Sequence, residues 1–218
     1  DATTYTATFA PSPNSTESAL ITVSGDSYTD AAGNTALASS SLSLSVDTLV
    51  PSLTISSSDT ALSVDETATI TFSFSETVHD FTLGDISVSG GSLKDLTALG
   101  TEQTEYTATF TPTVSSTDSA LITVSGDSYT DAAGNTATSA SSLTLSVDTE
   151  APTLTITAAD TELNSGDTAT ITFSFSETPT NFDQGDISIT GGSLTGFASS
   201  DATTYTATFA PSPNSTES

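Results

Sequence analysis

The segment TATITFSFSET at residues 67–77 alternates apolar with hydroxyl-bearing side chains. Ala68, Ile70, Phe72 and Phe74 occupy every second position, and Thr or Ser stands between them. Because successive side chains of a β-strand point to opposite faces, this period of two predicts a strand that packs one face on a core and exposes the other to water. The segment therefore predicts a protein built from β-sheets.

Six further short segments of similar composition surround this strand, with Gly, Asp, Asn and Ser turns between them. This spacing is typical of a β-sandwich, and no segment has a helical period. We therefore predict an all-β fold of tandem immunoglobulin-like, seven-stranded β-sandwiches joined end to end. The predicted strands of one complete sandwich are residues 53–57, 67–76, 85–89, 93–99, 105–113, 120–129 and 142–147.

The sequence repeats itself with a period of one domain. TATITFSFSET returns at residues 168–178, and SALITVSGDSYTDAAGNTA occupies both 18–36 and 119–137, a shift of 101 positions. A period of this size indicates autonomous domains rather than a solenoid with a shared core. The proline-containing joints VDTLVP and VDTEAP follow the last strand of each repeat. We predict the C-terminal half of one Ig-like repeat at residues 1–48, a complete repeat at 49–148 and the N-terminal part of the next at 149–218.

The chain is strongly acidic, with 27 Asp and Glu against one Lys or Arg, for a formal net charge of -26. Nucleic acids and anionic lipid surfaces are bound through Lys and Arg, so both partners are excluded. The chain has no Cys, which excludes disulfides and thiolate zinc sites. No apolar run approaches the roughly 18 residues of a membrane span, so we expect no membrane insertion in this segment.

Several carboxylates of each repeat are expected to meet where the joint reaches the sandwich, because two loops share that end with the joint. Two carboxylates about 4 Å apart repel by roughly 4 kcal/mol at an effective dielectric near 20, so a cluster needs a cation. Oxygen ligands without His or Cys favour Ca2+ over zinc or copper, and Mg2+ prefers fewer protein ligands. The predicted calcium ligands are Asp26, Asp30, Asp47, Glu76, Asp85, Asp127, Asp131, Asp148, Glu177 and Asp186.

The motif GDSYTDAAGNT, at residues 25–35 and 126–136, contains four of these ligands. Its spacing, D-x3-D-x3-N, lacks the alternation and the final Glu of an EF-hand, so the motif alone does not define a calcium site. Asp and Asn also form turns, and an acidic surface can simply be solvated. Backbone carbonyls of the joints, at Thr48 and Thr149, are expected to complete the coordination.

Five segments carry a family resemblance: DTEAPTLTIT, GDTATITFSFSE, GDISITGGSL, YTATFTP and SYTDAAGN. Together they span nearly a full repeat, which resembles the bacterial Ig-like domains found in tandem arrays in RTX adhesins of Gram-negative, often marine, bacteria. In such families the arrays are extenders that hold a terminal ligand-binding module away from the cell and depend on calcium, commonly at the domain joints. The resemblance implies a calcium-stabilised spacer at the bacterial cell surface, extracellular after type I secretion.

Catalysis is not expected. His79 is the only imidazole, and Thr180 stands at its position in the next repeat, so a histidine-dependent nucleophile is not indicated. Glycoside hydrolysis would need an aromatic-lined cleft, and the chain has no Trp.

Two kinds of partner remain open. In the extender reading, each repeat contacts neighbouring repeats end to end; in the alternative, an Ig-like or cadherin-like module itself binds a glycan or another protein copy. Residues 149–200 of one molecule and 1–48 of another also sum to a complete repeat, which predicts head-to-tail complementation of half-repeats, unless the segment is a window onto a longer tandem protein.

Overall fold

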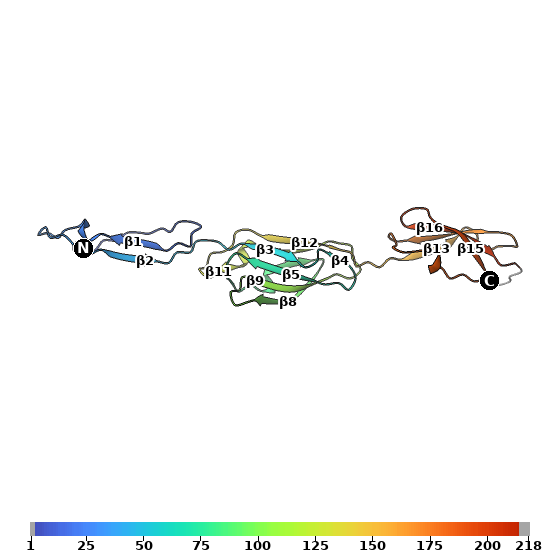
Figure 1. Ribbon diagram of the computed structural model, residues 1–218, viewed down its shortest axis with the longest axis horizontal. Helices are drawn as coiled ribbons and strands as arrows, with labels where there is room; N and C mark the ends of the chain where they lie inside the picture. The colour runs from blue at the N-terminus through green and yellow to red at the C-terminus, as the bar shows by residue number, and fades with distance from the viewer. Residues whose placement is uncertain (1–2, 214–218) are drawn as a thin grey trace. The chain divides into compact units, whose positions relative to one another are not determined.

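The structure is a computed structural model that describes residues 3–213; residues 1–2 and 214–218, which belong to the two identical end sequences, lie outside the described part. The chain forms two compact units, Asp1–Thr149 and Glu150–Ser218 (Figure 1). The first unit contains a complete β-sandwich and, ahead of it in the sequence, a two-stranded hairpin. The second unit contains one four-stranded sheet.

Two four-stranded sheets, in the orders β3-β5-β9-β8 and β4-β12-β10-β7, make up the complete sandwich. Neighbouring strands are antiparallel, except that β12 and β4 are parallel. A short antiparallel pair, β6 with β11, joins two of the loops. The elements are β3 Leu53–Ser57, β4 Ala61–Leu62, β5 Ala68–Phe74, β6 Val78–His79, η2 Leu83–Asp85, β7 Ile86–Ser89, β8 Gly91–Leu99, β9 Glu105–Pro112, β10 Ala120–Val124, η3 Gly126–Ser128, β11 Thr130–Asp131 and β12 Ser141–Val147.

The core of the sandwich lies between the two sheets, where the alternating apolar residues of β5 meet those of the opposite sheet. Ile70, Phe72 and Phe110 come from the first sheet and Ile122 and Leu145 from the second, and all five side chains are 0% exposed. The hydroxyl-bearing residues between the apolar residues of β5 are exposed or half-buried. The strand predicted from the period of two is therefore confirmed.

Four aromatic rings extend the core towards the loops that follow β5 and precede β11. Phe74 packs edge-to-face on Phe81 and on Tyr129, each at 5.0 Å between ring centroids, and Phe81 contacts Tyr106 at 5.2 Å. Such contacts stabilise beyond the area they bury. Phe74 stands two residues before Glu76 and Tyr129 two residues before Asp131, so this cluster anchors the backbone that carries both carboxylates.

A hairpin precedes the complete sandwich. It consists of β1 Ala19–Val23 and β2 Ser40–Leu44, with the 3-10 turn η1 Gly25–Ser27 after β1. Its register, with Ile21 opposite Leu42, repeats that of β10 with β12 one period later. Apolar side chains of the hairpin are partly exposed, because residues 3–48 contain only the last two strands of a sandwich.

The second unit forms a sheet in the order β13-β14-β16-β15, which repeats β3-β5-β9-β8. Its small buried cluster consists of Phe173, Leu194 and Ala207. The elements are β13 Leu154–Ala158, β14 Ala169–Phe175, η4 Gln184–Asp186, β15 Gly192–Ser199 and β16 Thr204–Pro211.

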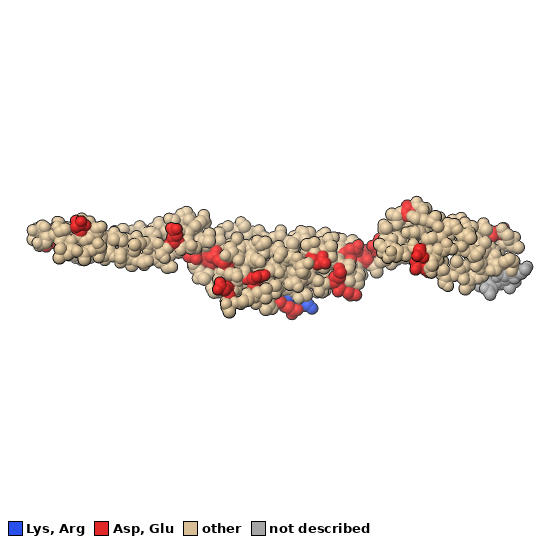
Figure 2. All heavy atoms as spheres, in the orientation of Figure 1, with Lys and Arg blue, Asp and Glu red and all other residues tan. Residues whose placement is uncertain are grey.

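The prediction of an all-β fold with immunoglobulin-like sandwiches is confirmed. The strand predicted at residues 120–129 is shorter and ends at Val124, because Ser128 N donates to Ser125 O and closes a 3-10 turn. None of the helical turns formed by residues 3–213 has the length and hydrophobicity needed for a membrane span. The face drawn in Figure 2 carries many carboxylates and shows a basic side chain at one place.

Candidate metal centre

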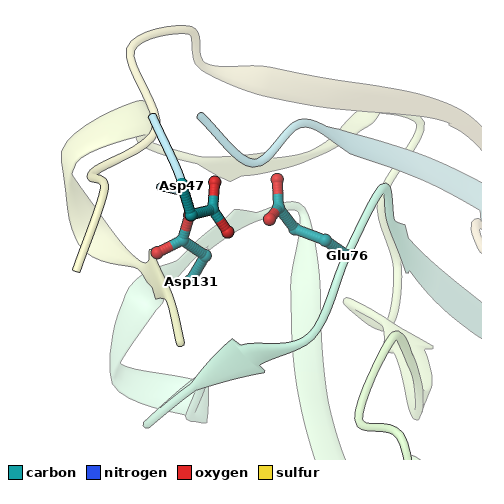
Figure 3. Close-up of side chains that lie close together, drawn as sticks. All are labelled: Asp47, Glu76 and Asp131. Atoms are coloured by element: carbon teal, nitrogen blue, oxygen red, sulfur yellow. The ribbon is translucent and has the colours of Figure 1, made fainter. Parts of the chain in front are cut away.

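Three carboxylates from separate parts of the first unit meet at one point. Asp47 comes from the joint after β2, Glu76 from the loop after β5 and Asp131 from β11. One oxygen of each lies within 4.8 Å of the others. Figure 3 shows the three groups turned towards one another. No other group of at least three His, Asp or Glu side chains in residues 3–213 comes together in this way.

Asp131 is held by the turn that follows it. Its Oδ1 accepts hydrogen bonds from Ala133 N at 2.9 Å and Asn135 N at 2.8 Å, and Oδ2 accepts from Asn135 Nδ2 at 2.7 Å. Gly134, at φ +91°, closes the turn by donating its N–H to Asp131 O at 3.2 Å. The side chain is 3% exposed, so its carboxylate is fixed in place before any ligand binds.

The pKa of Asp131 is lowered as the net result of two opposing causes. Burial raises it, but the hydrogen bonds from the Asn135 side chain and from the backbone of Asn135, Ala133 and Gly134 outweigh the burial. Asp131 therefore stays ionised at neutral pH.

Glu76 has the opposite shift. Burial raises the pKa of its carboxyl group, and the negative charges of Asp131 and Asp47 raise it further. Its Oε1 is buried and has no hydrogen-bond partner among residues 3–213. An unpaired buried carboxylate oxygen is unfavourable, because the group has lost water and gained nothing in exchange. The electrostatics of this point favour a positive charge beside Glu76.

Asp47 connects the joint to the sandwich. Its carbonyl oxygen accepts a hydrogen bond from Asn135 Nδ2 at 3.2 Å, and its Oδ1 accepts from Leu49 N at 3.1 Å. We refer to Asp47, Glu76 and Asp131 as the carboxylate trio. The Asn135 amide thus contacts two members of the trio, the side chain of Asp131 and the backbone of Asp47.

The neighbouring residue, Thr48, is tied to the preceding half-repeat. Its hydroxyl donates to Ser12 O at 2.7 Å and accepts from Ser15 N at 3.0 Å, and its N–H donates to Ser15 O at 2.9 Å. Thr149 makes the same contacts with Thr113 and Ser116. We refer to the arrangement of Thr48 with Ser12 and Ser15, and of Thr149 with Thr113 and Ser116, as the threonine clasp.

The other predicted ligands lie elsewhere. Asp26 and Asp127 stand exposed on η1 and η3. Asp85 accepts from Thr82 N at 2.8 Å in a capping box, and Asp186 accepts from Asp183 N at 2.9 Å in its counterpart. Each of these two carboxylates is hydrogen-bonded within its own turn. They therefore have the turn-forming role that is the alternative to calcium binding.

The remaining three predicted ligands are repeat counterparts of the trio. Asp30 makes the same turn as Asp131 but is exposed. Glu177 follows β14 in the second unit and is half-buried. Asp148 is exposed, and its backbone N–H donates to Leu62 O at 2.9 Å.

Sequence reasoning missed two contributors. The motif contains Asn135 but assigns it no role, although an Asn four residues after an Asp is the spacing that lets the amide return to the carboxylate. The sequence predicts the carbonyls of Thr48 and Thr149 as calcium ligands, and the structure adds a role that it does not predict, because the two hydroxyls form the clasp.

The donor set is chemically suited to a hard cation. Three carboxylates contain six oxygens, and Asp131 Oδ1 already accepts two N–H hydrogen bonds, so up to five remain for an ion. Ca2+ takes six to eight oxygen ligands in flexible geometry, so backbone carbonyls or water would complete the coordination. The set contains no nitrogen or sulfur, which makes it a poor site for zinc or copper. Because the three residues are distant in sequence, an ion here would link the joint, the loop after β5 and the turn after β11.

Comparison with known proteins identifies the family of this chain. The sequence model of the bacterial Ig-like domain family matches residues 1–46, 47–147 and 148–218, and the chain belongs to that family. The solved structure of the Escherichia coli adhesin FdeC is similar over 82% of this chain, with 14% sequence identity and a TM-score of 0.40. The match covers 62% of the FdeC chain. No curated protein sequence matches.

Proposed function

We propose that this chain is a calcium-stabilised extender segment of a large bacterial surface adhesin of the RTX type, which holds a distal ligand-binding region away from the cell. The observation that carries the proposal is the carboxylate trio Asp47, Glu76 and Asp131, in which the residue from the joint meets two residues of the following repeat. The role is mechanical and not catalytic.

The joint supports this proposal because its two central residues have different partners. The threonine clasp at Thr48 ties the joint to Ser12 and Ser15 of the preceding half-repeat. The Asp47 carboxylate lies with Glu76 and Asp131 of the following repeat. An ion held by the trio would therefore fix the end of one repeat to the start of the next, which is what a load-bearing extender requires.

The charge balance supports calcium. A chain with a net charge of -26 and one basic residue has almost no cations of its own to place among three carboxylates. At 4.8 Å, two carboxylates repel by about 3.5 kcal/mol at an effective dielectric near 20. Extracellular calcium modules bind at roughly 0.1–1 mM, so a site with modest affinity is filled outside the cell. The proposed location is the bacterial cell surface.

Calcium titration of the 218-residue protein tests the proposal. Isothermal calorimetry is expected to show one calcium site with a dissociation constant of roughly 0.1–1 mM. Small-angle scattering with 10 mM CaCl2 or with EGTA is expected to show a stiffer joint in calcium. Asp131→Asn is expected to remove that site. Asp127→Asn is the matched control, since Asp127 lies in the same motif but stands exposed outside the trio. Equal scattering curves in both conditions would contradict the extender proposal.

A glycan-binding role has less support. Tyr5 and Tyr28 are exposed aromatic residues, but their counterparts Tyr106 and Tyr129 are buried in the core of the complete sandwich. Their exposure follows from the incomplete half-repeat, so they do not define an aromatic platform for a sugar.

A further inference from the structure

The end of the complete sandwich opposite the carboxylate trio contains a parallel strand pair. β4 pairs there with the last residues of β12, Ser146 opposite Ala61 and Val147 opposite Leu62. The other strand pairs of the described residues are antiparallel. Figure 1 shows β4 and β11, the strand that carries Asp131, at opposite ends of the sandwich.

Backbone hydrogen bonds continue this pairing into the joint that leaves the repeat. The Ser146 N–H donates to Thr60 O at 2.8 Å, and the Asp148 N–H donates to Leu62 O at 2.9 Å. The chain is therefore still fastened to β4 at the first residue after β12.

The next residue, Thr149, is fastened to a different part of the repeat. Its N–H donates to Ser116 O at 2.9 Å, and its Oγ1 accepts from Ser116 N at 3.1 Å and donates to Thr113 O at 2.6 Å. Thr149 is 6% exposed, so loss of its hydroxyl would leave buried polar groups without partners. The threonine clasp thus holds the exit of the chain to the loop between β9 and β10.

The clasp depends on the Thr side chain and not on the sequence of the loop that it contacts. Thr48 makes the same bonds to residues 12–15, which read SPNS, whereas residues 113–116 read TVSS. The loop contributes a backbone N–H and backbone carbonyls, which every loop sequence retains unless Pro occupies the donor position. The hydroxyl of the Thr in VDT is therefore the side-chain group that forms the clasp.

The direction of the strands decides how tension acts on this end of the repeat. Tension enters through residues 49–52 and β3, which leads to β4, and it leaves through β12 and Thr149. Because β4 and β12 are parallel, tension pulls them along their axes in opposite directions. Inter-strand hydrogen bonds run across the strand direction, so the bonds of this pair resist sliding together. In an antiparallel pair at these positions the same tension would open the bonds one after another.

We propose that β4, the end of β12 and the threonine clasp of Thr149 form a mechanical lock, so that the repeat unfolds under tension only when their hydrogen bonds break together. The lock lies at the opposite end of the repeat from the carboxylate trio and needs no ion. It rests on the proposed function in one respect, because only a chain under tension uses such a lock.

The clasp is needed because the parallel pair is short. β4 contains two residues, Ala61 and Leu62, so β4 alone offers few bonds to β12. Tension from the following part of the chain reaches Thr149 before it reaches Asp148 and β12. The clasp therefore takes up load ahead of the parallel pair and keeps the end of β12 beside β4.

Single-molecule force spectroscopy of the 218-residue protein in EGTA tests the lock by comparing two pulling directions. In the first direction the protein is pulled through its two chain ends. Unfolding of the complete repeat is recognised by a gain in length of roughly 300 Å, since about 100 residues extend at roughly 3.3–3.6 Å each and the folded length is lost. This direction makes β4 and β12 slide along one another.

In the second direction the protein is pulled between Val64→Cys and its C-terminal end. The chain has no Cys of its own, and Val64 is exposed in the loop after β4. Both points of attachment then load the same end of the parallel pair, so β12 is peeled from β4. The force in the first direction is expected to be about twice as high or more, because the bonds share the load. Equal forces in the two directions would overturn the proposal.

Two substitutions of Thr149 test the clasp. Thr149→Val keeps the shape of the side chain and removes the hydroxyl, so end-to-end unfolding at constant force is expected to accelerate about tenfold. Thr149→Ser keeps the hydroxyl and should restore most of the wild-type lifetime. Thr144→Val is the matched control, since Thr144 is an exposed residue of the same strand. Equal acceleration by Thr144→Val and Thr149→Val would contradict a specific role of the clasp.

A core substitution separates the lock from overall stability. Ile122 is 0% exposed and lies on β10, outside the lock. Ile122→Val should lower the melting temperature, because it leaves a small cavity, but it should change the end-to-end lifetime under force much less than Thr149→Val. If Ile122→Val shortens that lifetime as much, the force reports overall stability and the lock is refuted.

The same measurements distinguish the lock from the calcium site. The difference between the two pulling directions is expected in EGTA as well as in 10 mM CaCl2. If this difference is present in EGTA and calorimetry detects no calcium binding, the calcium proposal fails and the lock stands. A difference that appears only in CaCl2 would show that the resistance depends on an ion, which contradicts the lock.

Discussion

Replacing Glu76 with Gln is expected to have opposite effects on stability without and with calcium. In the absence of calcium the substitution removes one of three mutually repelling charges. At 4.8 Å and an effective dielectric near 20, each pair involving Glu76 repels by about 3.5 kcal/mol. Solvent at this partly exposed point screens much of that energy, so the expected gain in the free energy of unfolding is about 1–2 kcal/mol.

In calcium the same substitution would remove a ligand of the proposed site. With a dissociation constant of roughly 0.1–1 mM, 10 mM calcium would stabilise the wild-type fold by about 1.4–2.7 kcal/mol. The variant is expected to lose most of this stabilisation, because a neutral amide is a weaker ligand for calcium than a carboxylate. The variant should therefore melt above wild type in metal-free buffer, while in calcium that advantage disappears or reverses.

Differential scanning calorimetry measures both effects. For a domain of about 100 residues, 1 kcal/mol corresponds to about 4–8 °C in melting temperature, so the change of sign is well resolved. Asp127→Asn is the control and should shift the melting temperature little in either buffer. If Glu76→Gln lowers the melting temperature equally with and without calcium, Glu76 is a structural residue and the reasoning from charge repulsion is refuted.

Three further predictions concern the same end of the sandwich. Metal-free protein is expected to gain stability as pH falls from 7, because the raised pKa of Glu76 lets it bind a proton early, and to lose stability in stronger acid, where Asp131 with its lowered pKa is protonated. Melting temperatures measured across this pH range test both the gain and the loss of stability. Asn135→Ala removes donors to Asp131 Oδ2 and Asp47 O, so urea denaturation should show a loss of about 1–3 kcal/mol together with weaker calcium binding. Gly126→Ala places a Cβ 2.5 Å from Ser139 N, so calorimetry should show a loss of at least about 2 kcal/mol.

The fold was predictable because its determinants are local. The period of two at residues 67–77 fixes which face of β5 is buried, and the repeat extends that assignment to 168–178. The parallel pairing of β4 with β12 was not predictable. β4 is two residues long, and its pairing depends on where Ser146 and Val147 lie after the whole sandwich has formed.

The candidate site was only partly predictable, because an Asp in a turn looks the same in sequence whether its partner is local or distant. Asp85 and Asp131 are both Asp residues in turns. Asp85 is used by its own turn, and the Thr82-x-x-Asp85 spacing of a capping box was a readable signal. Asp131 also has local partners, but its approach to Asp47 and Glu76 depends on tertiary structure. The unpaired Oε1 of Glu76 depends on burial, which no local pattern reports.

The position of Asp47 in the sequence explains how a small site could control a joint. Thr48 is clasped to the preceding half-repeat, and Ser141 Oγ holds the start of the following repeat by donating to Leu53 O at 2.6 Å. Between these fixed points the joint includes Leu49, whose N–H donates to Asp47 Oδ1. Because Asp47 immediately precedes the clasp, an ion on its carboxylate would couple the two repeats directly and bypass the backbone torsions of residues 49–52. The same ion placed on a side chain within residues 49–52 would leave the torsions between it and the clasp free. The VDT order of the joint, with Asp immediately before the clasped Thr, is therefore the feature on which the proposed calcium-dependent stiffness would depend.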